Sequence, residues 1–530
     1  MIKINGEEID LLLRPLPWRS REKAKPRNSI SGLKTTVATI TLEKPIPAKG
    51  KATLEIEWNT KLPGGEGGIG HRMTQRWESK VFQPTQWFPR LAKFDDLRGW
   101  QRDEYLGPSE FFNNFGSFDV KINVPAGWIV SGTGTLQNPE EILTEETRNR
   151  LAKVTASNDE ITIIGENEKG LNTPENDQLI WHYKADKVND FAWAASNEYI
   201  WKAITAVIPR KGPVPIHMLY LPENKDNFVK AAENSRHALE FYSKLWVPYA
   251  FQQLTLQDGP SDGMEYPMVI NSSQFAADHE VAHQWWPMML GTNETRYGWM
   301  DEGFDTYMNI LSDADVAGKP TMLDGWGQRY GGISGNEDEP TMMWQSNYGG
   351  DMTGFQTYGK ASMMLSMLGG IVGDNVVQDA MKNYTKAWVF KHPSPWDFVH
   401  FMSSELKLDL GWFWYYWLWT TESVNGSIQN VKIDSDTTMV SVHQAGGMPS
   451  PVVLKVEFEE GDSNINPMSN SKMIDKNTAI VTWPASVWFS GNRTFNAELN
   501  FGSRKIKKIT FDPFARFPDD NAKDNVWPKN

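Results

Sequence analysis

Two histidines and the glutamate between them have the spacing of a metal site. Residues 279–283 read HEVAH, which places His279 and His283 four positions apart. On a helix such residues lie on one face, about 40° apart, and can bind the same ion. Glu280 lies about 100° from His279, so it can reach a water on the metal without binding the metal itself. The pattern predicts a metal centre that acts on water.

The metal needs a third ligand, and the neighbouring sequence contains four candidates for it. A catalytic zinc usually has three protein ligands and a water. The chain contains no cysteine, so its metal ligands must be His, Asp or Glu. The nearby carboxylates are Glu294, Asp301, Glu302 and Asp305. Local sequence does not decide between them.

Two helices would have to position these side chains. The segment SSQFAADHEVAHQWW is expected to be helical, with Ser272 or Ser273 as its cap and Pro287 closing it. Glu302 stands at the start of a second helical segment, residues 301–314, which could pack antiparallel to the first. Such a pair of helices would bring the candidate ligands together.

The composition is that of a globular protein with several domains. A length of 530 residues is too great for one hydrophobic core, so two to four domains are expected. A net charge of −13 weighs against a nucleic-acid partner. The first residues lack the layout of a signal peptide, and no stretch approaches eighteen apolar residues. We expect a soluble chain without a transmembrane segment, for which periplasmic, secreted and cytoplasmic locations all remain open.

Hydrophobic periodicity changes twice along the chain. Before about residue 200 it is mostly period two, as in residues 118–124, which indicates antiparallel β-structure. Residues 228–246 have a helical period and are followed by an expected strand at 252–258. Helical patterning then dominates over residues 271–420, and short alternating strands return after Gly426.

The chain carries GMEYP at 263–267, HEVAH at 279–283 and TYGKA at 357–361. In this order the three motifs resemble those of the aminopeptidase N family of gluzincin metallopeptidases. Members carry HExxH and a glutamate nineteen positions after the second histidine, which here is Glu302. Residues 263–267, GMEYP, are similar to the family's GxMEN exopeptidase loop, with Tyr-Pro in place of the asparagine. Residues 357–361, TYGKA, resemble the family's YEKG.

The resemblance implies a multidomain α+β architecture. Its parts would be an amino-terminal β saddle domain at 1–200, a thermolysin-like, mostly α catalytic domain at 201–425, a β-sandwich at 426–516 and a tail at 517–530. The first strands of the saddle are expected to precede Met1. The large helical carboxy-terminal domain of many members is expected to be absent.

The resemblance also implies roles at the metal centre. His279, His283 and Glu302 would bind one zinc ion per chain. Glu280 would act as general base and then as general acid. Tyr358 would donate a hydrogen bond to the developing oxyanion. From the sequence alone, Tyr358 is an ordinary core aromatic at a helix start, and only the resemblance makes it catalytic.

An aminopeptidase also needs groups that select a free amino terminus. The resemblance makes Glu265 the partner of the substrate's protonated α-amine, whereas the residue taken alone is an exposed loop glutamate. The backbone of Gly263 and Met264 would pair with an extended substrate. Family members usually add a second amine-binding residue from the saddle domain. The candidates for it here are Glu78, Gln83 and Gln86.

These motifs favour a zinc-dependent aminopeptidase acting on peptides with a free amino terminus. One alternative is a zinc endopeptidase or an epoxide-type hydrolase, although GMEYP argues against the endopeptidase. The other is an inactive scaffold that binds peptides or carbohydrates through some of the 24 tryptophans. The intact HEVAH, Glu302 and Tyr358 argue against that alternative. The sequence pattern carries no indication of the oligomeric state.

Overall fold

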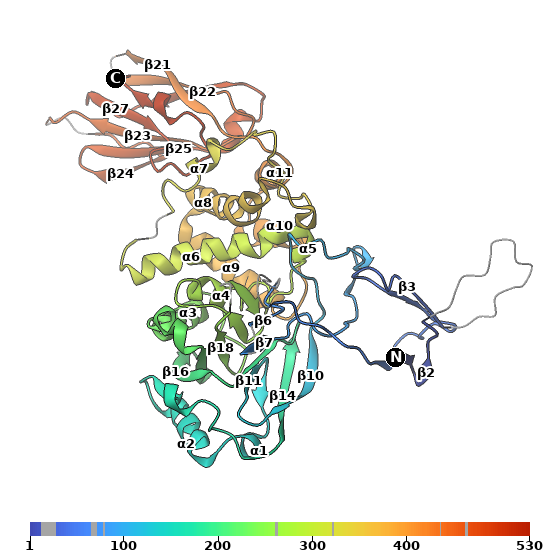
Figure 1. Cartoon of the computed structure of the whole chain (residues 1–530). Coiled ribbons are helices and arrows are strands. Elements are labelled where there is room, and N and C mark those ends of the chain that lie inside the picture. Colours follow the sequence, from blue (N-terminus) through green and yellow to red (C-terminus); the bar gives the residue numbers. More distant parts are fainter. Residues whose placement is uncertain are drawn as a thin grey trace, which may run out of the picture. The chain divides into compact units, whose positions relative to one another are not determined.

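The chain is divided into two compact units. The computed structural model describes residues 1–11, 28–64, 72–77, 80–259, 263–320, 323–434, 436–461 and 465–529. The first unit comprises Met1–Ile204, His217–Val229 and Gln252–Ser273, and the second Thr205–Ile216, Lys230–Phe251 and Gln274–Asn530. Between residues 204 and 274 the chain therefore alternates between the two units, in the green part of Figure 1. The domain boundary expected at residue 200 stays a prediction.

Antiparallel sheets build most of the first unit. Strand β10 (Gly116–Pro125) pairs with β14 (Gln178–Val188), and β12 (Thr135–Leu136) pairs with the other edge of β14. Along β10, Ile122 and Val124 are buried while their neighbours are exposed, which is the alternation predicted for 118–124. A second sheet has the order β11-β15-β7-β6. Its strands are β11 (Ile129–Gly132), β15 (Trp193–Ser196), β7 (Val81–Gln83) and β6 (Gln75–Trp77).

A six-stranded sheet has the order β13-β16-β17-β18-β20-β19. Its strands are β13 (Ile161–Ile164), β16 (Ile200–Ile208), β17 (Gly212–Tyr220), β18 (Leu254–Gln257), β20 (Val269–Asn271) and β19 (Met264–Tyr266). The strand predicted at 252–258 is β18. It pairs in parallel with β20, and β20 pairs antiparallel with β19. Strand β19, which carries the GMEYP motif, is therefore the edge strand.

Helices make up the central part of the second unit. The predicted helix at 228–246 is α3 (Ala231–Leu245), which packs against α4 (Ala277–Ala282). Helix α6 (Glu302–Val316) packs in turn against α4, against the π-helix η6 (Phe355–Lys360) and against α8 (Ala361–Val372). The other helices of this part are α9 (Asp374–Trp388), α10 (Pro395–Leu406) and α11 (Gly411–Trp419). None of the helices in the described ranges is both long and apolar enough to cross a membrane.

Two sheets at the carboxy-terminal end share one hydrophobic core. The first has the order β21-β22-β26 and the second β24-β25-β23-β27-β28 (Figure 1, orange to red). Their strands are β21 (Gly426–Asp434), β22 (Thr437–Gln444), β26 (Thr494–Leu499), β24 (Ser471–Asp475), β25 (Thr478–Trp483), β23 (Val452–Phe458), β27 (Ile506–Phe511) and β28 (Val526–Trp527). Val440 and Val442 of one sheet and Leu454 and Val456 of the other belong to the same buried cluster. The segment expected to be a tail contributes β28, which pairs with β27.

Candidate metal centre and active site

The histidines lie on a helix that is shorter than predicted. Helix α4 begins at Ala277 with Ala276 at its cap position, so neither Ser272 nor Ser273 caps it. After Ala282 the backbone tightens: the amides of residues 284 and 285 bond to carbonyls three residues back, at 3.1 and 2.9 Å. The prediction that the helix extends from these serines to Pro287 was wrong. The short helix still contains the one turn that places two histidines on the same face.

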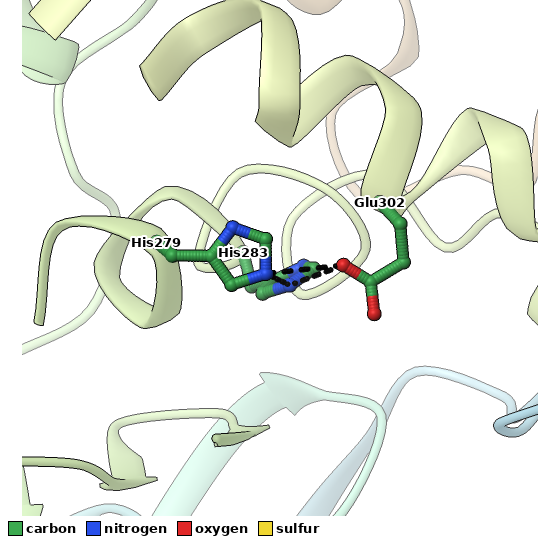
Figure 2. Close-up of side chains that lie close together, drawn as sticks. All are labelled: His279, His283 and Glu302. Carbon is green, nitrogen blue, oxygen red and sulfur yellow. Dashed lines mark hydrogen bonds and ion pairs between the residues drawn. The ribbon is translucent and has the colours of Figure 1, made fainter. Parts of the chain in front are cut away.

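Three side chains from α4 and α6 converge on one point (Figure 2). The Nε2 atoms of His279 and His283 are 3.1 Å apart. Glu302 Oε2 lies 3.1 Å from Nε2 of His279 and 3.2 Å from Nε2 of His283. Three ligands on a tetrahedral zinc at 2.0–2.1 Å would be roughly 3.3 Å from one another. The spacing, and the two nitrogens and one oxygen, fit Zn²⁺.

The other three candidate ligands lie elsewhere. Asp301 and Asp305 place carboxylate oxygens 2.8 and 2.5 Å from Nδ1 of His283, on the side of the ring opposite Nε2. Glu294 begins the short helix α5 (Glu294–Tyr297), and it forms no ligand cluster with either histidine among the described residues. Only Glu302 faces both Nε2 atoms. The packing of α4 and α6 therefore favours Glu302 among the four candidates that local sequence left open.

Contacts at the Nδ1 atoms orient both imidazole rings. His279 Nδ1 lies 2.9 Å from Oδ1 of Asn309, and His283 Nδ1 lies 2.9 Å from the carbonyl oxygen of Trp286. An Nδ1–H that donates to an oxygen leaves the Nε2 lone pair free for a metal. Asn309 is itself held by Asp278, whose Oδ2 accepts from its amide at 3.1 Å.

Asn309 was not among the residues predicted from the sequence, although its spacing from Glu302 indicates a place at the site. It follows Glu302 by seven residues on α6. Seven residues are nearly two full helical turns, so both side chains lie on the same face. An amide on the face that carries a metal ligand is a natural outer partner for a histidine bound to the same ion.

The charges at the centre favour a cation. Burial alone would lower the pKa of His279, but the carboxylates of Glu302 and Glu280 outweigh it and raise this pKa to about 10. Burial would likewise raise the pKa of Glu302, but His283 and His279 hold it well below its usual value. Burial raises the pKa of Asp305 to about 6. A buried site with this many carboxylates stabilises positive charge, and a divalent ion supplies it.

Glu280 and Tyr358 border the same centre from different elements. Glu280 follows His279 on α4 and is 3% exposed. Tyr358 lies on the π-helix η6, and its hydroxyl donates to Oε1 of Glu302 at 2.6 Å. Its ring stacks on that of His279, with 6.2 Å between the centroids. Partial burial and the neighbouring Glu302 carboxylate raise the pKa of Tyr358.

Gly303 allows α6 and η6 to approach each other. A Cβ at this position would lie 2.5 Å from Cβ of Ala361 and 2.8 Å from the carbonyl oxygen of Thr357. Any side chain there would push the two elements apart. Because Gly303 follows Glu302 and Thr357 precedes Tyr358, this close approach of the two backbones brings Glu302 and Tyr358 near each other.

The residues predicted to select the substrate amine belong to the first unit. Gly263 has φ of +101°, a conformation that favours glycine, and its amide donates to the carbonyl of Asn271 at 2.8 Å. Met264 and Glu265 lie on the edge strand β19. Glu265 is 3% exposed, so it is not the exposed loop residue that the sequence alone suggested. Its Oε1 has no hydrogen-bond partner among the described residues.

The second amine-binding residue has several candidates in the first unit. Glu78 lies outside the described residues. Gln83 donates to the carbonyl of Asp258 at 2.8 Å. Gln86 donates to Asp190 and to the hydroxyl of Tyr266. Gln75 is a further candidate that was not predicted from the sequence. It is buried, and its Oε1 has no hydrogen-bond partner in the described ranges.

Comparison with known proteins identifies the segment that holds the metal centre. Residues 269–417 match the peptidase family M1 domain, and this segment contains HEVAH, Glu302 and TYGKA. The family predicted from the motifs is thereby confirmed for this segment. No curated protein matches the sequence.

Two solved structures share the fold. Aminopeptidase A of Legionella pneumophila, in complex with aspartic acid, is 12% identical over 83% of this chain and 47% of its own, with a TM-score of 0.55. The M1 zinc metallopeptidase of Deinococcus radiodurans is 14% identical over 79% of this chain and 83% of its own, with a TM-score of 0.51. The chain thus spans slightly less than half of the Legionella protein. The predicted multidomain α+β class agrees with both.

Proposed function

Because residues 269–417 match the peptidase family M1 domain, we propose that the chain is a zinc-dependent aminopeptidase. It would bind one Zn²⁺ through His279, His283 and Glu302 and remove residues from peptides with a free amino terminus. The observation that carries the proposal is the convergence of two Nε2 atoms and one carboxylate oxygen within 3.2 Å of one another.

The residues around this centre supply the steps of peptide hydrolysis. When bound, zinc lowers the pKa of a coordinated water toward neutrality and polarises the scissile carbonyl. Glu280 accepts a proton from the attacking water as the new C–O bond forms. It then delivers a proton to the leaving amine as the C–N bond breaks. Tyr358 donates its hydroxyl hydrogen to the oxyanion, where charge develops only in the transition state.

Glu265 gives the reaction its preference for chain ends. A buried carboxylate with an oxygen that lacks a partner is costly, and a substrate ammonium group would satisfy it. An internal peptide bond offers no such charge. The outer edge of β19 can also accept an extended substrate through the backbone of Gly263 and Met264. These features support an exopeptidase over an endopeptidase.

The domain division belongs to the same proposal. Residues 1–200 would form the β saddle, 201–425 the thermolysin-like catalytic domain and 426–516 a β-sandwich. The antiparallel sheets before residue 200, the helices around the metal centre and the shared core of the last two sheets support this division. A terminal segment at 517–530 would complete the chain.

Hydrolysis of aminoacyl amides and of matched peptides with free or acetylated amines tests the function. The purified protein should cleave the free-amine substrates, lose activity with a chelator and regain it with Zn²⁺. Acetylated peptides should not be cleaved. Chelator-sensitive cleavage of acetylated peptides at internal bonds would replace the aminopeptidase with an endopeptidase. Absence of all hydrolysis by a zinc-loaded protein would point to a binding scaffold.

A further inference from the structure

The turn that carries Tyr358 also forms a buried ion pair. Lys360 ends the π-helix η6, two residues after Tyr358. Its ammonium nitrogen lies 2.7 Å from Oε1 of Glu339, and the side chains of both residues are fully buried. Neither residue has a part in the proposed chemistry. Two buried charges at this place therefore need a different explanation.

The pair is held in a network that fixes its geometry. Lys360 also donates to the carbonyl of Thr420 at 3.1 Å, and its ammonium lies 4.7 Å from the centre of the Tyr330 ring. Glu339 accepts from the hydroxyl of Tyr330 at 2.8 Å and from the amide of Gly335 at 3.0 Å. A buried ion pair adds little net stability compared with apolar side chains, whereas its directional bonds restrict the positions of its partners.

The rest of the π-helix is held as well, whereas the side chain of Tyr358 has few supports beyond its stack on His279 and its bond to Glu302. Phe355 stacks on Tyr330 with 6.0 Å between centroids and an angle of 18°. Gln356 donates to the carbonyls of Thr341 and Met342 at 3.0 and 3.1 Å. Tyr358 itself is 44% exposed. Because so much of the side chain is exposed, the direction of its hydroxyl also depends on the backbone beneath it, and π-helical turns are frequently found at functional sites.

We propose that Lys360, through its ion pair with Glu339, is a positioning residue that fixes the π-helical turn and so aims the hydroxyl of Tyr358 at the metal centre. The inference rests on the proposed function, because it concerns the group that would stabilise the oxyanion. A displacement of about 1 Å can cost roughly 100-fold in rate, so a rigid support for one hydroxyl has a catalytic effect.

A double-mutant cycle on kcat tests this coupling. The variants are Lys360→Met, Tyr358→Phe and both together. Lys360→Met/Glu339→Gln removes both charges, so it leaves no unpaired buried ion and preserves folding if Lys360→Met alone is unstable. Asp374→Asn is the control, because it breaks the ion pair with Arg516, made at 2.9 and 2.8 Å, elsewhere in the same unit. Zinc content, melting temperature, KM and kcat are measured for each variant.

Lys360→Met, or its double variant with Glu339→Gln, should lower kcat by about tenfold or more, with zinc content unchanged and KM within about threefold. In the Tyr358→Phe background the same change should lower kcat by less than about twofold, because the group it positions is already gone. Asp374→Asn should lower the melting temperature and leave kcat near that of the parent. Equal losses in both backgrounds, or a parental kcat in the charge-free double variant, would overturn the inference. A Tyr358→Phe enzyme with the parental kcat would overturn the proposed role of Tyr358 instead, and this inference with it.

Discussion

Tyr358 and Glu302 are joined by a hydrogen bond of 2.6 Å between the phenol hydroxyl and Oε1 of the carboxylate. The other carboxylate oxygen, Oε2, faces the two histidines. One glutamate therefore connects the metal centre to the group proposed to stabilise the oxyanion. The hydroxyl is already within one hydrogen bond of the ligand set, so a small movement suffices to transfer it to a substrate oxygen.

Tyr358→Phe should lower kcat by about 100- to 1000-fold with little change in KM. The loss of one oxyanion donor removes stabilisation that exists only in the transition state. Steady-state kinetics on an aminoacyl amide measure both constants. Tyr415→Phe, at a position that is 55% exposed on α11, is the control and should match the parent. A changed KM with an unchanged kcat would assign Tyr358 to substrate binding or packing.

His283→Ala should abolish stoichiometric zinc binding. The substitution removes one of three ligands, and the two that remain do not make up the usual three-ligand catalytic site. Metal analysis of the purified protein should give one zinc per parent chain and far less in the variant. His237→Ala, which removes a partly exposed histidine paired with Asp315, should keep the full amount. Undiminished zinc in His283→Ala would refute the ligand assignment.

Glu280→Gln should keep the metal and lose most of the turnover. The amide has nearly the same size as the carboxylate but cannot accept a proton from the attacking water. A loss of kcat greater than about 100-fold is expected, since general acid–base catalysis commonly contributes at least that much. The exposed Glu233→Gln on α3 serves as the comparison. If kcat stayed within about tenfold of the parent, another group would have to be the base.

Glu265→Ala should weaken hydrolysis of free-amine substrates selectively. Removing a charge-assisted hydrogen bond costs about 1.5–3 kcal/mol, or roughly 10- to 150-fold in kcat/KM. Acetylated peptides never make this bond, so any residual activity on them should be unchanged. The exposed Glu175→Ala in the same unit controls for the loss of a carboxylate. Equal losses on both substrates would mean that Glu265 acts through general stability.

Glu168→Gln should reduce stability in a manner that depends on pH. Both carboxylate oxygens of Glu168 accept from Arg150, at 2.7 and 2.8 Å, and this arginine lowers the pKa of Glu168 from its ordinary 4.5 to about 2. A depressed folded pKa contributes stability above the unfolded pKa, and this contribution is lost as pH falls from about 4.5 to about 2. Because the pair is partly exposed, the loss at neutral pH should be about 1 kcal/mol.

Denaturant unfolding of parent and variant between pH 2 and pH 7 measures this difference. The two free energies should converge at the acidic end. Glu146→Gln is a matched control, because Glu146 bonds to the same arginine but its side chain is 76% exposed. It should cost less than Glu168→Gln at neutral pH, where the contribution of Glu168 is fully present. A difference that does not vary with pH would show that the carboxylate charge is not the cause.

The sequence by itself determined which faces of single elements carry chemistry. The HEVAH spacing places two imidazoles on one face of any helical turn, and this holds although α4 ends at Ala282 rather than near Pro287. The alternation in β10 and the periodicity of α3 likewise follow from local burial along one element. The predicted serine cap was wrong because the helix begins only at Ala277, and the Ser272 hydroxyl donates to the carbonyl of Ser273 instead.

The tertiary structure decided which elements meet. Glu302, Asp301 and Asp305 are equally good ligands in sequence, and only the packing of α6 against α4 places the first at Nε2 and the others at Nδ1 of His283. The partners Asn309 for His279 and Glu339 for Lys360 are 30 and 21 residues away in the chain. Contacts over such separations depend on how whole helices and loops pack, and periodicity within one element carries no information about them.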